Sequence, residues 1–98
     1  MAYSDDGEEL TVIFDEAKDR ENRRKHGISL NRATDLFSGR HVEQLDDTTD
    51  YGEERWSATG MIDGAFFNCT HTDRGRYRRI ISLRRATRRE VEKYIQAE

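Results

Sequence analysis

The chain has 98 residues, of which 34% are hydrophobic and 38% are charged, and its formal net charge is -3. This length predicts one domain that buries roughly 60–65% of its unfolded surface around a modest core. The longest apolar stretches span a few residues, which excludes a membrane span, and the polar N-terminal sequence argues against a secretory signal. The single cysteine, Cys69, excludes an intramolecular disulfide and fits a reducing cytoplasm.

The first half of the sequence predicts one strand followed by a polar helix. Residues 1–9 (MAYSDDGEE) are expected to form a disordered acidic leader, and residues 10–98 a single domain. A short β-rich strand is expected at 10–14. Asp15 is then a good N-cap for a helix that ends at Gly27, a natural C′ residue. This helix is almost wholly polar, so it buries little by itself.

A second helix is expected from its cap, Ser29, through Phe37, with an apolar face that includes Ala33 and Leu36. The pattern then changes to the alternation that is typical of strands. Four strands are expected, at 41–45, 55–62, 65–72 and 76–84, with an acidic loop at 46–52.

Turn and cap signals complete the predicted order. Asp63-Gly64 is a strong hairpin signal. The capping box Thr87-Arg88-Arg89-Glu90 opens a final helix. The order β-α-α-β-β-β-β-α predicts an α+β domain with an antiparallel sheet, two N-terminal helices and one C-terminal helix.

Alternation also assigns side chains of the last two strands to faces of the sheet. On 65–72 it groups Ala65, Phe67, Cys69 and His71, and Cys69 is therefore expected to be buried. On 76–84 it groups Tyr77, Arg79, Ile81 and Leu83 on one face, and Arg76, Arg78, Ile80, Ser82 and Arg84 on the other.

The charge distribution is strongly polarised, because eight arginines lie between residues 74 and 90. Residues 74–98 carry nine Lys and Arg against three Glu, whereas residues 1–73 carry eight against seventeen acidic residues. The planar guanidinium group suits phosphate recognition. A solvated basic face is the alternative, but this density of arginine favours an anion site for nucleic acid.

No motif indicates a metal or a cofactor. His26, His41 and His71 are widely spaced, and one cysteine does not make a zinc set. Glycine-rich phosphate-binding loops are absent from the sequence.

Three motifs resemble the BrnT-type toxins of bacterial type II toxin–antitoxin systems. The first family motif is matched in register by Asp15, Lys18, Asn22, Lys25, His26, Gly27, Ile28 and Ser29. The family's central motif, E-x-R, is taken to correspond to Glu54-Arg55-Trp56, and its last motif to residues 79–86 together with Glu90. The resemblance covers about residues 12–94. Phe14 and Leu83 depart from the family's tryptophan and alanine, and both are apolar exchanges.

The resemblance implies a RelE-like ribonuclease fold, RNA cleavage that inhibits translation, and neutralisation by a BrnA-type antitoxin in a hetero-oligomer. That antitoxin is a ribbon-helix-helix protein, so operator DNA would be contacted only through the complex. An alternative is a catalytically decayed toxin that still binds its antitoxin and co-represses the operon. A generic basic RNA-binding domain is a third possibility.

Metal-free RNA cleavage needs a base for the 2′-hydroxyl, cations for the charge on the phosphorane, and an acid for the departing 5′ oxygen. The expected catalytic residues are Lys25, His26, Glu54, Arg55, Arg79 and Arg84, and the expected RNA-binding residues are Trp56, Arg85, Arg88 and Arg89.

Structural roles remain open for several of these residues. Lys25 and His26 could serve as cations at a helix C-terminus, and Glu54 and Arg55 as a surface ion pair. Trp56 could belong to the core instead of stacking on a base. Asp15 and Asn22 are expected to be structural, through capping and tertiary hydrogen bonds. His71 is expected to be a structural histidine of its strand, with a role as an acid or a base in catalysis as the alternative.

Overall fold

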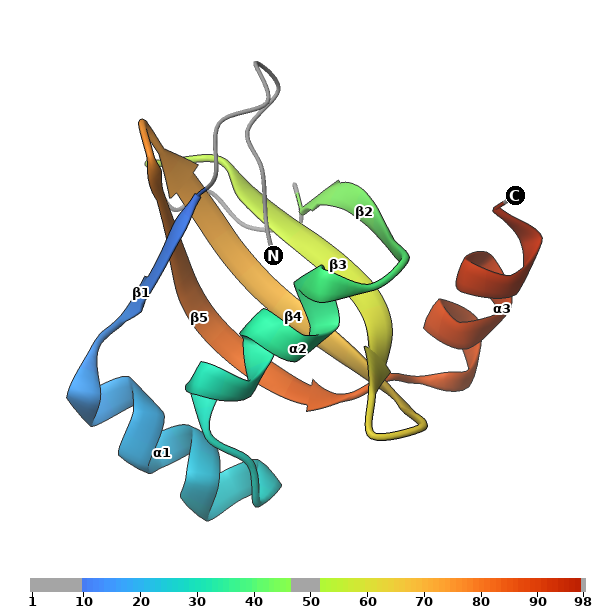
Figure 1. Cartoon of the computed structure of the whole chain (residues 1–98), viewed down its shortest axis with the longest axis horizontal. Coiled ribbons are helices and arrows are strands. Elements are labelled where there is room, and N and C mark those ends of the chain that lie inside the picture. Colours follow the sequence, from blue (N-terminus) through green and yellow to red (C-terminus); the bar gives the residue numbers. More distant parts are fainter. Residues whose placement is uncertain (1–9, 47–51, 98) are drawn as a thin grey trace.

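The computed structural model describes residues 10–46 and 52–97, which form a five-stranded sheet and three α-helices (Figure 1). In chain order the elements are β1 (Thr11–Phe14), α1 (Glu16–His26), the 3₁₀ helix η1 (Leu30–Arg32), α2 (Ala33–Ser38), β2 (His41–Asp46), β3 (Arg55–Ile62), β4 (Ala65–Arg74), β5 (Tyr77–Arg85) and α3 (Arg88–Gln96). The α+β class and the order of elements are confirmed, and the RelE-like relation stays a prediction. The expected leader, residues 1–9, and most of the expected acidic loop lie outside the described residues.

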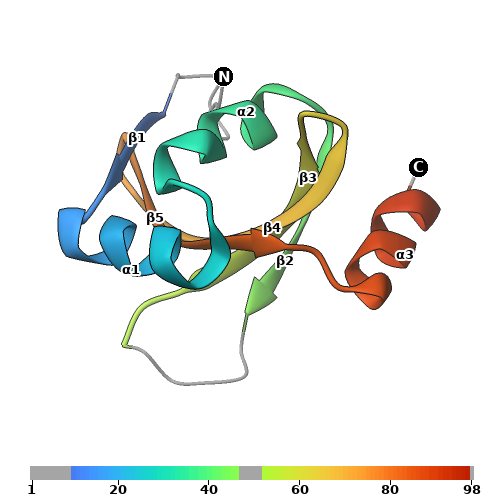
Figure 2. The ribbon, with the colours of Figure 1, turned by 90° about the horizontal axis from the view of Figure 1, so that it is seen from below.

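The sheet has the strand order β1-β5-β4-β3-β2. Strands β2 to β5 pair antiparallel, whereas β1 joins the edge of β5 in parallel. Helices α1 and α2 lie on the same side of the sheet, and α3 stands apart beyond the end of β5 (Figure 2). Among the described residues, no helix is long and apolar enough to cross a membrane.

Helix α1 begins and ends where the sequence predicts. The Asp15 carboxylate caps it by accepting hydrogen bonds from two backbone amides of the first turn, and Gly27 ends it with φ 70°. Asn22 is buried and fixes the helix to β5: its amide donates to the Leu83 carbonyl at 2.8 Å and accepts from the Leu83 N–H at 3.0 Å. The expected capping by Asp15 and tertiary hydrogen bonding by Asn22 are confirmed.

The expected second helix is divided into η1 and α2. Asp19 of α1 accepts hydrogen bonds from the Leu30 N–H at 2.7 Å and the Ser29 hydroxyl at 2.9 Å, and Ser29 also caps η1. These bonds hold the first turn against α1, so it tightens into a 3₁₀ turn. The backbone hydrogen bond from Leu30, opposed by burial, keeps the pKa of Asp19 below its usual value.

The core lies between α2 and the sheet. Its fully or nearly fully buried members are Leu10, Leu30, Ala33, Leu36, Phe37, Ala58, Ile62, Phe67, Cys69, Ile80 and Leu83. Burial raises the pKa of the Cys69 thiol, and the expectation that Cys69 is buried is confirmed. Gly60 permits close packing here, because a Cβ at this position would lie 3.0 Å from the Leu36 Cγ atom.

A β-bulge in β5 changes which side chains share a face. Thr70 pairs with Ser82 and His71 with Ile80, which leaves Ile81 as the extra residue in the β4–β5 ladder. The faces predicted for 76–84 by simple alternation are therefore wrong. Ile80 and Leu83 are both buried in the core, and Arg79 and Arg84 lie together on the opposite face.

Helix α3 begins at the expected capping box, in which Thr87 and Glu90 cap each other's backbone amides. It contacts the β2–β3 side of the molecule through Tyr94, whose ring meets the edge of Phe66 with centroids 5.2 Å apart. Arg40 lies 4.1 Å from the centre of the Tyr94 ring and donates to the Tyr94 carbonyl at 2.7 Å. These contacts hold α3 although none of its described residues is buried.

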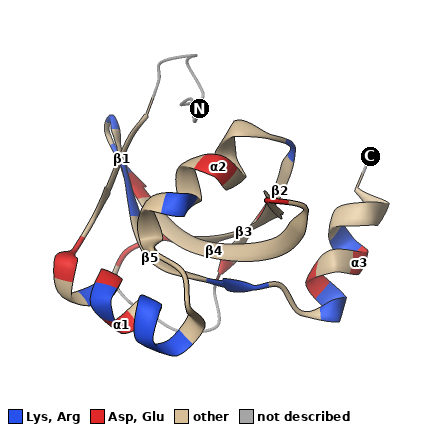
Figure 3. Cartoon of the chain, turned by 60° about the horizontal axis from the view of Figure 1, so that its bottom comes forward, with Lys and Arg blue, Asp and Glu red and all other residues tan. Residues whose placement is uncertain are grey.

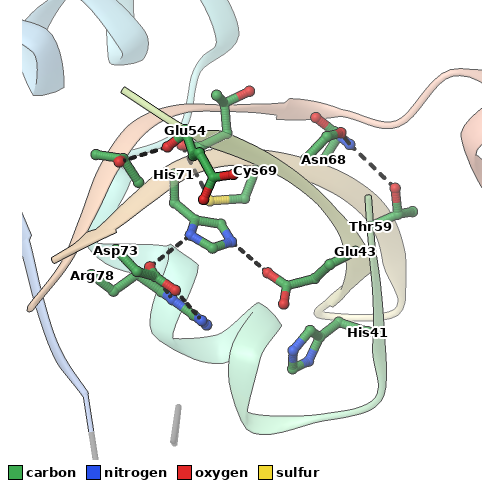
Figure 4. A network of polar contacts seen from close by, with 12 residues as sticks. His41, Glu43, Glu54, Thr59, Asn68, Cys69, His71, Asp73 and Arg78 are labelled. Atoms are coloured by element: carbon green, nitrogen blue, oxygen red, sulfur yellow. Dashed lines mark hydrogen bonds and ion pairs between the residues drawn. The ribbon is translucent and has the colours of Figure 1, made fainter. Parts of the chain in front are cut away.

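A buried polar network joins β2, β4 and β5 beneath α2 (Figure 4). His71 is fully buried, and its ring nitrogens contact the carboxylates of Glu43 and, at 2.9 Å, Asp73. Asp73 also accepts two hydrogen bonds from Arg78, both 2.9 Å long. The Arg78 guanidinium lies 4.3 Å from the centre of the Phe37 ring, which covers the network. The expected structural role of His71 within its strand is thus supported by its burial and its contacts.

The two carboxylates fix the protonation state of His71. Carboxylates only accept hydrogen bonds, so both ring nitrogens must carry protons. Burial acts to lower the pKa of His71, but the hydrogen bonds to Asp73 and Glu43 outweigh it and raise that pKa above its usual value. Burial acts to raise the pKa of Asp73, and its bonds to His71 and Arg78 outweigh this and hold it well below the usual range. These contacts therefore favour the charged forms of both His71 and Asp73.

Replacing His71 with glutamine should lower the free energy of unfolding at pH 6 by about 1–3 kcal/mol, because two carboxylates lose a charged donor. The raised pKa of His71 means that its stabilisation is complete below pH ~6.5 and is lost as the pH rises through the folded-state pKa. Urea unfolding at pH 6 and pH 9 should therefore show the wild type losing more stability than H71Q. Equal losses in the two proteins would contradict a charged His71.

Candidate functional site

The face of the sheet that points away from α1 and α2 carries the arginines singled out in the sequence. We call it the arginine face, and from β3, β4 and β5 it includes Arg55, Ser57, Thr59, Asn68, Thr70, Thr72, Arg74, Tyr77, Arg79, Ser82 and Arg84. Stretches of Lys and Arg lie along β5 (Figure 3). The sequence predicted Arg55, Arg79 and Arg84 as catalytic residues, and the structure brings these three onto one surface.

Glu53 connects two of these arginines. Its carboxylate lies 2.9 Å from a terminal nitrogen of Arg79 and 3.5 Å from one of Arg55. The Arg79 side chain stays 42% exposed, whereas those of Glu53 and Arg55 are 23% and 19% exposed. A hydrogen-bond acceptor is thus held between two cations, one of which remains open to solvent.

Glu90, from the first turn of α3, holds Arg84. The carboxylate and the guanidinium form two parallel hydrogen bonds of 2.9 and 3.0 Å, the geometry of a bidentate pair. Burial acts to raise the pKa of Glu90, but Arg84 and the Thr87 amide outweigh it, and the pKa lies below the usual value. The hydrogen bond to Glu90 raises the pKa of Arg84. Both groups are charged, and Arg84 remains 36% exposed.

Lys25 and His26 belong to a different part of the molecule. Both lie in the last turn of α1, where cations stabilise the helix C-terminus. The Lys25 ammonium lies 3.3 Å from Glu21 of the same helix. His26 lines a hollow together with Arg85, whose guanidinium lies 5.4 Å from the Phe67 ring on the helix-covered face. The structure thus places Lys25, His26 and the Arg85 guanidinium on the side of the sheet opposite to the arginine face.

The remaining predicted residues are dispersed. Trp56 pairs with His71 across β3 and β4, so its half-buried side chain faces the helices. Arg88 is 95% exposed and lies 3.4 Å from Glu92, and Arg89 is also exposed. Glu54 is exposed too, and its backbone carbonyl accepts a hydrogen bond from Thr72. Roles for these four residues in RNA binding or catalysis stay predictions.

Two carboxylates on the arginine face, Glu53 and Glu90, were not among the predicted site residues. The signal for Glu53 was present in the central motif, because E-x-R leaves one residue between the two and fits Glu53 with Arg55. The adjacent Glu54 obscured it. Glu90 was recognised as a capping residue, but only the fold shows that the same carboxylate binds Arg84.

The arginine face can therefore hold a phosphodiester. Arg79 and Arg84 offer exposed guanidinium groups, and Glu53 offers a carboxylate beside one of them. Phosphate binding by a planar guanidinium group and proton transfer by a neighbouring carboxylate are the elements of phosphoryl transfer. Within residues 10–46 and 52–97, no three His, Cys, Asp or Glu side chains gather as they would around a metal ion.

Comparison with known proteins links this site to a family. Residues 14–90 match the family model described as the ribonuclease toxin BrnT of a type II toxin–antitoxin system. That range contains Glu53, Arg55, Arg79, Arg84 and Glu90. A search of curated proteins found no match. Since the family model covers more than half of the sequence, the chain belongs to the BrnT family of ribonuclease toxins from type II toxin–antitoxin systems.

Proposed function

We propose that this protein is an endoribonuclease that cleaves RNA without a metal ion at the arginine face, and so inhibits translation in the cytoplasm. A BrnA-type antitoxin neutralises it in a hetero-oligomer, and operator DNA is contacted only through that antitoxin. The observation that carries the proposal is the pairing of exposed Arg79 with the Glu53 carboxylate on one face of a protein from a ribonuclease family.

The reaction proposed is attack of a 2′ oxygen on the adjacent phosphorus. The P–O5′ bond breaks, which leaves a 2′,3′-cyclic phosphate on one product and a 5′-hydroxyl on the other. Glu53 accepts the 2′ proton, since it is a carboxylate held beside the phosphate-binding arginine. Arg79, which lies beside Glu53, stabilises the charge on the phosphorane oxygens, and Arg84 adds positive charge farther along the same face. Water at this open face returns a proton to the departing 5′ oxygen.

Glu90 positions Arg84 in this scheme. A guanidinium held by two parallel hydrogen bonds loses little further freedom when it binds phosphate, because its orientation is already fixed. Arg55 gives Glu53 a second cationic contact besides Arg79. Lys25 and His26 stay candidates from the family resemblance, although they lie on the other side of the sheet.

Arg79→Ala should lower the rate of RNA cleavage by roughly 10²–10³-fold, the usual effect of removing one donor that stabilises transition-state charge, and Arg84→Ala should lower the rate as well. Both variants should also relieve growth arrest when the protein is expressed without antitoxin. Arg20→Ala is the matched control, because Arg20 is an exposed arginine of α1. Wild-type cleavage by both variants would remove these arginines from the site.

Glu53→Gln should lower cleavage by roughly 10²–10⁴-fold, because the amide cannot take the 2′ proton. Glu54→Gln is the matched comparison: it makes the same change one residue along, where the side chain is exposed. Single-turnover cleavage of a short RNA by the two variants decides between the neighbours. If only Glu54→Gln loses activity, the assignment of the base to Glu53 is wrong.

Cleavage should continue in the presence of EDTA and should give 2′,3′-cyclic phosphate ends, which mass spectrometry of the products detects. Products with 3′-hydroxyl ends, or cleavage that stops with EDTA and returns with a divalent cation, would contradict the proposed reaction.

A second candidate function is a catalytically decayed toxin that binds its antitoxin and co-represses the operon. The observation in its favour is that Arg79 and Arg84 are each neutralised by a glutamate. Expression of the wild type without antitoxin separates the two, since growth arrest requires an active toxin.

A further inference from the structure

The arginine face extends past Arg79 into a hollow at the β1–β5 edge of the sheet. The hollow has a volume of about 320 Å³ and is lined by Ile13, Glu53, Thr72, Arg74, Tyr77 and Arg79. Such a volume lies at the lower end of the range for small-ligand sites, roughly 300–1,000 Å³. Of these residues, the proposed chemistry uses only Glu53 and Arg79.

An aromatic and an aliphatic side chain form the apolar part of the hollow. Tyr77 is 54% exposed and Ile13 is 40% exposed. The parallel pairing of β1 with β5 places Thr11 opposite Tyr77 and Ile13 opposite Arg79, so Ile13 and Tyr77 lie on the same face. An exposed aromatic ring beside an aliphatic side chain offers a surface on which a planar group can stack.

Two arginines are neighbours of Tyr77 on the same face of the sheet. Arg74 is its direct partner across the β4–β5 ladder, and Arg79 follows two residues later on the same strand face. The exposed ring thus has one arginine beside it across the ladder and another farther along its own strand. A single RNA strand presents the matching alternation, with a planar base between two phosphates.

We propose that this hollow is a subsite for one nucleotide of single-stranded RNA, next to the phosphate that is cleaved. The base stacks on Tyr77 beside Ile13, and the flanking phosphates contact Arg74 and Arg79. The subsite rests on the proposed function in that its ligand is RNA. Stacking of this kind tolerates any base. The subsite therefore adds affinity and fixes the position of the RNA along the arginine face, but it adds no sequence preference.

The test uses a short 2′-O-methyl oligoribonucleotide, which lacks the attacking hydroxyl and therefore stays intact. Tyr77→Ser should weaken its binding by roughly 5- to 100-fold in fluorescence anisotropy, the usual loss when a base loses its aromatic partner. Tyr77→Phe keeps the ring and should bind as the wild type does. Leu45→Ser is the matched control, since Leu45 is an exposed apolar residue on the opposite edge strand. Thermal unfolding checks that each variant is folded.

A series of oligonucleotides, each with one abasic nucleotide, tests the stacking partner directly. At one position the abasic change should weaken binding to the wild type but not to Tyr77→Ser. Equal affinity of Tyr77→Ser and wild type, no binding by the wild type, or the same abasic losses in both proteins would each overturn the subsite. Tyr77-dependent binding of an acidic peptide that displaces the oligonucleotide would assign the hollow to a protein partner instead, and would also overturn it.

Cleavage assays separate this inference from the proposed function. If the wild type binds the oligonucleotide through Tyr77 but leaves unmodified RNA intact, the subsite stands and the ribonuclease proposal fails. If Tyr77→Ser cleaves unmodified RNA with the wild-type KM and kcat, the subsite fails and the ribonuclease proposal stands.

Discussion

The extra residue in β5 is the constraint on which the arrangement of the arginines depends. Ile81 bulges out of the β4–β5 ladder. The alternation of side chains between the two faces of β5 therefore shifts by one residue at this point. Arg79 and Arg84, five positions apart, would lie on opposite faces of a regular strand. The bulge places both on the arginine face, and it allows Ile80 and Leu83 to enter the same core.

The glutamates on the arginine face set its charge. Glu53 and Glu90 each neutralise one arginine, so the local excess of positive charge is smaller than the number of arginines suggests. In the proposed function, phosphates of the RNA would meet Arg79 and Arg84 with a carboxylate already in place beside each. Such pairing costs some phosphate affinity but fixes two long side chains in advance, which favours a defined geometry over nonspecific attraction.

Much of the fold follows from patterns within the sequence, whereas the site depends on contacts between distant segments. Strong local signals, such as the Asp15 cap, Gly27 and the Thr87 capping box, predicted elements that the structure confirms. The sequence does not predict the bulge. Residues 78–82 are Arg-Arg-Ile-Ile-Ser, so either choice of faces places one arginine and one isoleucine on each side of the sheet. Glu53 and Glu90 were missed for a related reason: their partners lie on other elements, and a neighbouring glutamate or a local capping role already accounted for them.

The network beneath α2 explains why the register of β5 is fixed. His71 lies at the bulge itself, and Arg78 pairs with Asp73 on the helix-covered face, under Phe37. A shift of β5 by one residue in one direction would put Arg84 in the fully buried place of Leu83. A shift in the other direction would bring Tyr77 opposite Asp73 and put Arg79 in the buried place of Ile80. Either shift would remove an apolar side chain from the core, and the second would also leave Asp73 without its charged partner. Two adjacent arginines thus have separate tasks: Arg78 fixes the strand, and its fixed register is what exposes Arg79 on the arginine face.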